Sequence, residues 1–490
     1  MLKSSLLEML RSFSKEELLR FEDLIRSPYH NKNSNALKLF SLIKKYRPDF
    51  NSEELEKESV WNKMYPGKAY NYGVMKNLIH ELSKLGMKFI VLEEFEENIL
   101  ERDTILLNAL NNRNITKLFN IKMNELERQY SKTSFNDEYF FVNDFYAAMS
   151  RNNWIKLYHY RANNINTPTD KELIESSAMF IYSFLIYLVK YYNNILSDSH
   201  SRNYPLDSNI LSVFLKDISP VIIDKLLIII KEYSERDFKI LTVFRNLSVL
   251  LLSENNSVDY GLFKKSLMEN INILSKWDAK DLFGCLGNSL NYLNPSEIDI
   301  EKERFDISKT LLNNDIMFNR DGTLTAADYN IYVWRAFEAN EFTEIEKFTK
   351  KYINKIPKDN IEYSENISRA ILLFGKREYD RALEIISAAD YPDFVTKVRL
   401  RQLKVKCLYE LNDYLSFENE NKSVYHFLKN NKSLSAKIRR DTENLFDKIK
   451  RMFRLKEKFN QYEFVKLKKE ISLSSVSRTT WLNRKINEFV

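Results

Sequence analysis

Four basic side chains at regular spacing are the first feature of this sequence that could carry chemistry. Lys76, His80, Lys84 and Lys88 recur at every fourth position, and residues four apart lie on one face of an α-helix. Apolar residues at helical spacing define another face of the same segment: Met75, Leu78, Leu82, Leu85, Phe89 and Leu92. Because lysine contacts nucleic-acid phosphates, the stripe predicts a surface that faces nucleic acid. A solvated helix face is the alternative interpretation.

The segment that carries this stripe resembles a DNA-binding module. Residues 55–65 and the helix after them are similar to the winged-helix domains of some bacterial transcriptional activators, which place a second helix in the DNA major groove. The resemblance implies that residues 55–94 bind DNA, and some of those activators also carry tetratricopeptide-like arrays. The sequence departs from the pattern in two ways: Glu81 lies beside the stripe, and no arginine in the stripe could read base edges.

A second basic region lies between Lys437 and Lys469. Apolar residues are interleaved with its basic ones: Leu445, Ile449, Phe453 and Phe459. This pattern predicts an amphipathic terminal helix that caps a stack of helices. Contact with phosphates or with an acidic protein is the alternative.

Patterns typical of enzyme active sites are missing from the sequence. It contains no Gly-x-Gly-x-x-Gly, no Walker-type phosphate loop and no Gly-x-Ser-x-Gly. The five histidines are scattered, and none forms a His-Glu-x-x-His pair that would bind zinc. Cys285 and Cys407 lie far apart and predict two buried thiols. We therefore expect a non-enzymatic protein without cofactor or metal; a hydrolase with an unrecognised site is the alternative.

The composition favours helices over sheets. Only 8 glycines and 9 prolines occur in 490 residues, and sheet proteins and nucleotide-binding folds need glycine at turns and phosphate loops. A net charge of +7 permits a nucleic-acid or acidic partner without requiring one. The most apolar run, 178–189, is shorter than the roughly 20 residues of a membrane span, and the first residues lack a signal-peptide pattern. We expect a cytoplasmic protein with no membrane contact.

Start and stop signals predict the order of the helices. Ser14 and Glu17 form a capping box, and a helix is expected over about 74–94. The clearest internal repeat is an aromatic residue, four mostly polar residues and a second aromatic residue. It occurs at 337–342, 374–379 and 409–414. An aromatic side chain after a helical turn fills the gap between two paired helices, so each copy predicts a helical hairpin.

These copies resemble the tetratricopeptide repeat. The residues that match its small positions and its post-turn tyrosine are Ala370, Tyr379, Ala382 and Ala389. The resemblance implies hairpins whose alanines let the paired helices approach closely, stacked into a superhelix. Arg377 stands where glycine is usual, and Ile345 and Phe417 take the place of Ala382 in the flanking copies. One clear repeat is expected between two degenerate ones; a non-repeating helical bundle is the alternative.

Most of the chain also resembles a family of uncharacterised bacterial helical proteins. Residues 26–32, 64–71 and 75–78 carry this likeness, as does the ending around Trp481 and Leu482. The family has no assigned activity, so the likeness implies a bacterial helical protein and no particular function.

The sequence therefore predicts an all-α protein with a small helical module at 1–95, a helical hairpin array at 96–300 and tetratricopeptide-like repeats with basic capping helices at 301–490. Stacked hairpins commonly bind a peptide or a partner helix. The leading functional prediction is a scaffold that binds a protein or peptide partner. The alternative is a DNA-binding transcriptional regulator with a helix–turn–helix-like module and a partner-sensing repeat region.

Overall fold

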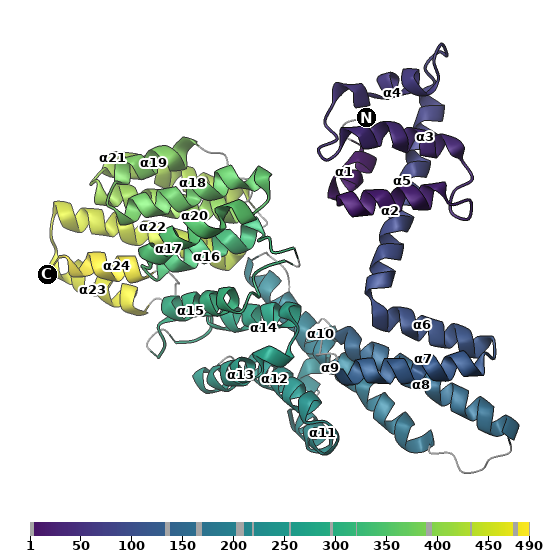
Figure 1. The fold of residues 1–490 in the computed structure, drawn as a ribbon. Helices are drawn as coiled ribbons and strands as arrows, with labels where there is room; N and C mark the ends of the chain where they lie inside the picture. The colour runs from purple at the N-terminus through teal and green to yellow at the C-terminus, as the bar shows by residue number, and fades with distance from the viewer. Residues whose placement is uncertain are drawn as a thin grey trace. The chain divides into compact units, whose positions relative to one another are not determined.

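The chain is all-α in the computed structural model. The structure describes residues 4–132, 138–162, 169–201, 210–217, 220–253, 256–294, 297–319, 321–388, 394–431, 434–473 and 479–489. Within these ranges every regular element is a helix and no β-strand occurs (Figure 1). The all-α prediction is confirmed for these residues.

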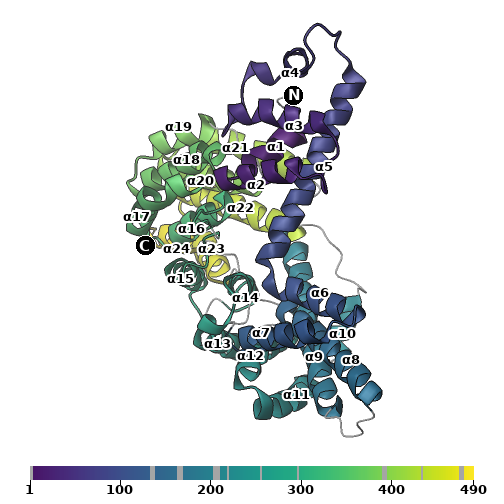
Figure 2. The same cartoon turned by 45° about the vertical axis from the view of Figure 1, so that its right-hand side comes forward.

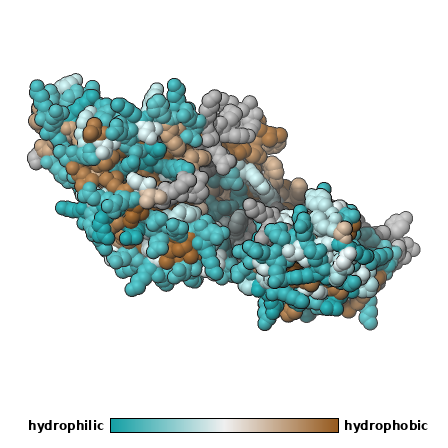
Figure 3. Space-filling model, turned by 90° about the horizontal axis from the view of Figure 1, so that it is seen from above, coloured by the Kyte–Doolittle hydropathy of each residue, from teal (hydrophilic) through white to brown (hydrophobic). Residues whose placement is uncertain are grey.

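The chain forms two compact units. The first comprises Met1–Ser131 and Tyr146–Thr169, and the second comprises Lys132–Phe145 and Asp170–Val490. None of the described helices is both long enough and apolar enough to cross a membrane. On the face shown in Figure 3, hydrophilic residues cover most of the surface, and hydrophobic ones gather in smaller areas.

The first unit begins with a small bundle built around one long helix. Helix α5 packs against α1, α2 and α3, and the rings of Phe21, Phe40 and Phe89 meet in its core, with Phe21–Phe40 centroids 5.1 Å apart. The predicted capping box is confirmed: the Glu17 amide donates to Ser14 Oγ, and the Ser14 amide donates to the Glu17 carboxylate. The elements are α1 (Ser5–Ser12), α2 (Lys15–Arg26), α3 (Ser34–Ile43), η1 (Lys44–Tyr46), η2 (Glu53–Leu55), α4 (Lys57–Met64) and α5 (Tyr72–Glu97).

Three further helices complete this unit and the segment beside it: α6 (Ile99–Asn112), α7 (Thr116–Lys132) and α8 (Glu138–Ala162). Asn114 adopts a left-handed conformation (φ 56°) between α6 and α7. The Phe119 ring on α7 stacks on Trp154 of α8 with centroids 5.3 Å apart. This aromatic pair joins the two helices through their apolar faces.

The second unit opens with helices that pack mainly on their neighbours in the chain. Contacts run from α11 to α12, α13, α14 and α15 in turn. A buried ion pair adds a long-range link: Lys190 Nζ of α9 donates to Asp278 Oδ1 of α14 at 2.6 Å. The elements are α9 (Thr169–Ser201), α10 (Ile210–Asp217), α11 (Pro220–Tyr233), α12 (Glu235–Leu252), α13 (Ser257–Glu269), η3 (Ile271–Ile273), α14 (Lys276–Ser289) and α15 (Ile300–Asn313).

The remaining helices of this unit pack as pairs. Helices α16 and α17, α18 and α19, and α20 and α21 are paired, while α16 also contacts α18 and α20 contacts α22. Figures 1 and 2 show this block in green and yellow. The elements are α16 (Ala326–Glu338), α17 (Phe342–Tyr352), η4 (Ile353–Lys355), α18 (Lys358–Gly375), α19 (Tyr379–Ala388), α20 (Phe394–Glu410), α21 (Tyr414–Asn430), α22 (Ala436–Glu457), α23 (Gln461–Leu473) and α24 (Thr479–Asn487).

The three turns inside these pairs have one geometry. Asn340, Arg377 and Asn412 are left-handed, with φ of 60°, 64° and 58°. In each turn the next amide donates to the carbonyl five residues back: Glu341 to Ala336 (2.8 Å), Glu378 to Leu373 (3.0 Å) and Asp413 to Leu408 (2.9 Å). This bond satisfies a carbonyl at the helix end, as in a Schellman motif. The turns fall within the three segments whose aromatic spacing predicts hairpins.

Arg377→Gly is expected to stabilise the second of these turns. A side chain in the left-handed region costs about 1 kcal/mol that glycine does not pay, and Arg377 is exposed. The free energy of unfolding, measured by urea titration, should rise by about 1 kcal/mol. Lys376→Gly is the matched control, because Lys376 has φ −79° and ψ 0° and should lose roughly 0.5–1 kcal/mol. Equal effects of both changes would contradict the argument.

Candidate partner-binding site in the C-terminal helices

Aromatic side chains join successive helix pairs close to their turns. Phe337 at the end of α16 packs edge-on against Phe374 at the end of α18, with centroids 5.5 Å apart. Phe374 also contacts Tyr379 at 5.4 Å. In the third pair, Tyr409 contacts Phe453 of α22 at 5.0 Å. The aromatic residues near these turns therefore connect neighbouring helices.

Two of the four residues predicted to pack the repeats are fully buried. Ala370 and Ala382 are fully buried, and Tyr379 is half-buried, which raises the pKa of its hydroxyl. Ala389 lies outside the described residues. Ile345 and Phe417, at the place of Ala382 in the flanking pairs, are also fully buried. The four fully buried side chains pack inside the protein and are not available to a partner.

Arg335 is the centre of a group of cations from different helices. Its Nη1 donates to Ser308 Oγ of α15 at 2.9 Å, and a Cβ built on Gly287 of α14 would lie 3.5 Å from its Nη2. Burial, reinforced by the positive charges of Arg304 and Arg399, lowers the pKa of Arg335 to about 10. Arg335 is thus a cation that two other cations oppose.

Two adjacent residues bring Arg304 and Lys437 together. Arg304 Nη2 donates to Asn291 Oδ1 at 2.8 Å, and Lys437 Nζ lies 5.9 Å from the ring centre of Tyr292. Burial lowers the pKa of Lys437, and Arg304 and Arg440 lower it further, against the opposing effect of Asp441. An ammonium of α22 and a guanidinium of α15 therefore lie within electrostatic reach of each other.

Arg399 of α20 completes the group. Its guanidinium lies 5.7 Å from the ring centre of Trp334, the residue before Arg335. We call Arg304, Arg335, Arg399 and Lys437 the cationic cluster; all four are partly exposed.

Carboxylates of the described residues also act on the cationic cluster. Glu301 and Glu338 raise the pKa of Arg335, Asp441 raises that of Lys437, and a Glu301 oxygen lies 3.6 Å from Arg304 Nη1. Among the described residues, these carboxylates offset part of the positive charge around Arg335, Arg304 and Lys437. Cations that depress one another's pKa are stabilised by an added anion, so the cluster is suited to receive a carboxylate.

The predicted basic stripe belongs to the first unit. Lys76, His80, Lys84 and Lys88 are all exposed on α5, which begins and ends slightly beyond the predicted helix. Residues 55–94 contain α4, α5 and no strand, so a helix–turn–helix arrangement stays a prediction and no wing of paired strands accompanies it. The four side chains do share one helix face, as their spacing predicts.

The cationic cluster is missed by motif reading because its members are far apart in sequence. Arg304, Arg335 and Arg399 lie on three different helices, and only Lys437 falls in the basic region expected to cap the stack. The composition of α20 is the sequence feature that could have indicated the cluster, because this helix carries five basic residues and one acidic residue. Such an excess on a helix with many buried positions indicates cations held near a core.

Other reactive groups are enclosed. Cys285 and Cys407 are buried and free, as the sequence predicts, and burial raises the pKa of both thiols, that of Cys407 to about 12. The described part of the chain has no group of three or more histidine, cysteine, aspartate or glutamate side chains placed to bind a metal ion. No protein-family model, curated protein or solved structure matches this chain.

Proposed function

We propose that this chain is a non-enzymatic interaction protein whose C-terminal helices form tetratricopeptide-like repeats and bind an acidic segment of a protein partner. The three identical turns at Asn340, Arg377 and Asn412 support the repeats. The aromatic contacts between successive pairs, such as Phe337–Phe374, support a regular stack. Stacked hairpins of this kind present extended surfaces to peptides.

The cationic cluster is the observation that carries the proposal. Other cations on α20 and α22 form ion pairs with carboxylates of the protein. Arg401 and Lys404 pair with Glu420, and Arg451 pairs with Glu470. Arg335, in contrast, donates to a neutral serine hydroxyl and is opposed by two cations. A carboxylate delivered by a partner would form charge-assisted hydrogen bonds with such a guanidinium. Trp334 and Tyr292 offer aromatic surface next to these cations.

Arg335→Gln tests this proposal directly. The probe is a fluorescein-labelled peptide of eight alternating glutamate and glycine residues with a free C-terminal carboxylate, titrated with the full chain. Loss of one charge-assisted hydrogen bond costs about 1.5–3 kcal/mol, so binding should weaken roughly tenfold or more. Fluorescence anisotropy measures the dissociation constant.

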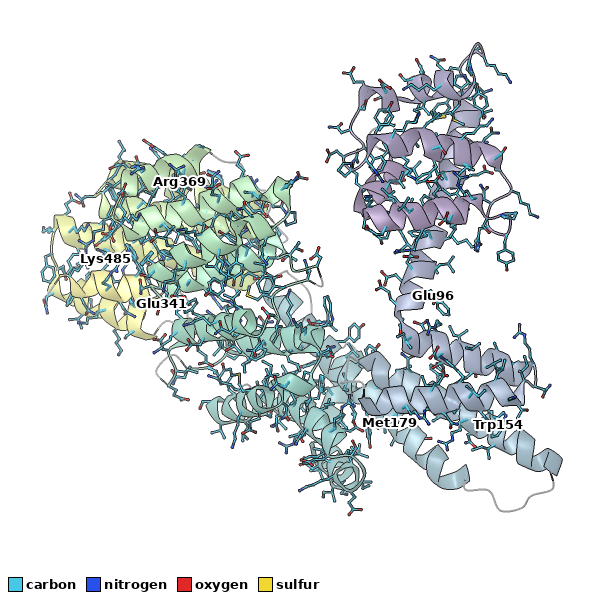
Figure 4. The ribbon with its side chains drawn as sticks, viewed as in Figure 1. Glu96, Trp154, Met179, Glu341, Arg369 and Lys485 are labelled. Atoms are coloured by element: carbon cyan, nitrogen blue, oxygen red, sulfur yellow. The ribbon has the colours of Figure 1, made fainter. Side chains whose placement is uncertain are left out.

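Arg369→Gln is the matched control, because Arg369 is exposed on α18 outside the cationic cluster (Figure 4). It should leave the affinity unchanged. A glutamine version of the peptide checks that charge drives binding. Thermal unfolding of both variants checks that the helices remain folded. The proposal is wrong if the acidic and glutamine peptides bind equally, or if both variants weaken binding to the same extent.

A further inference from the structure

The exposed face of α5 carries a row of basic side chains. Lys76, Lys84 and Lys88 are exposed, and none of them takes part in an ion pair within residues 4–132. From Lys76 to Lys88 the helix rises about 18 Å. His80 lies between them on the same face. This row is long enough to follow a strand of several nucleotides.

The carboxylates nearest to this row are turned to other partners. Glu81 accepts a hydrogen bond from Asn33 Nδ2. Glu93, one turn beyond Lys88, is paired with Arg20 of α2. These two carboxylates of α5 are therefore drawn toward the body of the first bundle, while Lys76, Lys84 and Lys88 stay exposed to solvent.

An exposed aromatic side chain lies beside the row, on the loop that Asn33 ties to Glu81. The loop between α2 and α3 is braced by Asn31, whose Nδ2 donates to the Ile25 and Asn33 carbonyls at 2.9 and 3.0 Å. Tyr29 in this loop is 86% exposed, and Lys88 Nζ lies 6.0 Å from its ring centre. A tyrosine so exposed on a braced loop contributes little to the core.

A second tyrosine lies at the other end of the row. Tyr72, in the first turn of α5, is 58% exposed, and Lys57 Nζ of α4 lies 5.2 Å from its ring centre. The face thus has cations along its length and an exposed aromatic ring beside a lysine at each end. Grooves that bind single strands combine these two groups: cations contact the backbone, and aromatic rings stack on bases.

We propose that this face of α5, together with Tyr29 and Tyr72, binds single-stranded nucleic acid. The lysines contact phosphates, and the two tyrosine rings stack on unpaired bases. A duplex is the poorer fit, because its bases are already stacked and the row has no arginine to read base edges in the major groove. The site lies in the first unit and is additional to the acidic-peptide site of the second.

Anisotropy titrations of the full chain test this site. The probes are a fluorescein-labelled thymidine 20-mer, a uridine 20-mer and a 20-base-pair DNA duplex. We expect either single strand to bind at least tenfold more tightly than the duplex. Affinity for the single strands should fall with salt, with a slope of about −0.7 for each phosphate contacted. If the duplex binds more tightly than either single strand, the proposal is wrong and the face binds a groove of double-stranded DNA instead.

Two variants separate the roles of charge and stacking. Lys84→Glu/Lys88→Glu should weaken single-strand binding at least tenfold and make the salt dependence shallower. Tyr29→Ala removes one stacked base, worth roughly 1–3 kcal/mol. It should weaken binding about tenfold and leave the salt slope unchanged.

The matched control is Lys15→Glu/Lys38→Glu, which makes the same charge change at exposed lysines of α2 and α3. It should weaken binding much less than Lys84→Glu/Lys88→Glu. If the two double variants lose affinity equally, the row is an ordinary solvated helix face and the proposal is overturned. Circular dichroism at 222 nm confirms that each variant keeps its helices.

Discussion

Lys190→Met is expected to lower the free energy of unfolding by about 3–5 kcal/mol, because it leaves a buried carboxylate without its ammonium partner. Asp278 is fully buried and the Lys190 side chain is only 8% exposed. The Ser275 hydroxyl also donates to that carboxylate, at 2.7 Å. Methionine keeps most of the aliphatic part of the lysine side chain. The decrease in the free energy of unfolding therefore reflects the lost charge more than lost packing.

Urea denaturation followed by circular dichroism measures this loss, and Lys265→Met is the control. Lys265 is 72% exposed and lies 3.9 Å from Glu269, and such surface pairs contribute about 0–1 kcal/mol. The double variant Lys190→Met/Asp278→Asn removes both charges and should recover most of the stability. A loss for Lys190→Met no larger than that for Lys265→Met would show that water, rather than Lys190, compensates the Asp278 charge.

The Lys190–Asp278 pair shows where sequence reasoning ends. Lys190 directly follows the apolar run 178–189, and a lone lysine after such a run signals a charge near a core. Periodicity reports which face of a helix is buried, but it does not report which other helix covers that face. The two partners are separated by 88 residues, so only the packing of α9 against α14 brings them together.

Helix caps and turns can be predicted from the sequence because they depend on residues that are close together in the chain. The Ser14 capping box, in which the Glu17 amide donates to Ser14 Oγ, depends on side chains within one helical turn. The turns at Asn340, Arg377 and Asn412 likewise lie within the short segments 337–342, 374–379 and 409–414. The cationic cluster depends on side chains from four helices that meet across the stack. The sequence therefore predicted the hairpins and missed the site that they assemble.

Gly375→Ala is expected to destabilise the chain by about 1–3 kcal/mol, although alanine is the better helix former. Gly375 is the last residue of α18, and a Cβ built there would lie 2.4 Å from Phe342 Cδ1 and 2.6 Å from its Cε1. Phe342 opens α17, and its ring packs against Phe337 at 6.0 Å. An added methyl group at position 375 would therefore displace the Phe342 ring from its place between α17 and the end of α18.

Gly284→Ala is the matched control, because Gly284 also lies in a helix and a Cβ there would have no atom within 4 Å. It should stabilise the chain by about 0.5–1 kcal/mol, so the two substitutions are expected to differ in sign. Gly375→Ala/Phe342→Leu should recover part of the loss, because the smaller side chain yields to the new methyl group. If Gly375→Ala matched Gly284→Ala instead, the ring would be free to move, and close approach of helices at the turns would not determine the spacing of the stack.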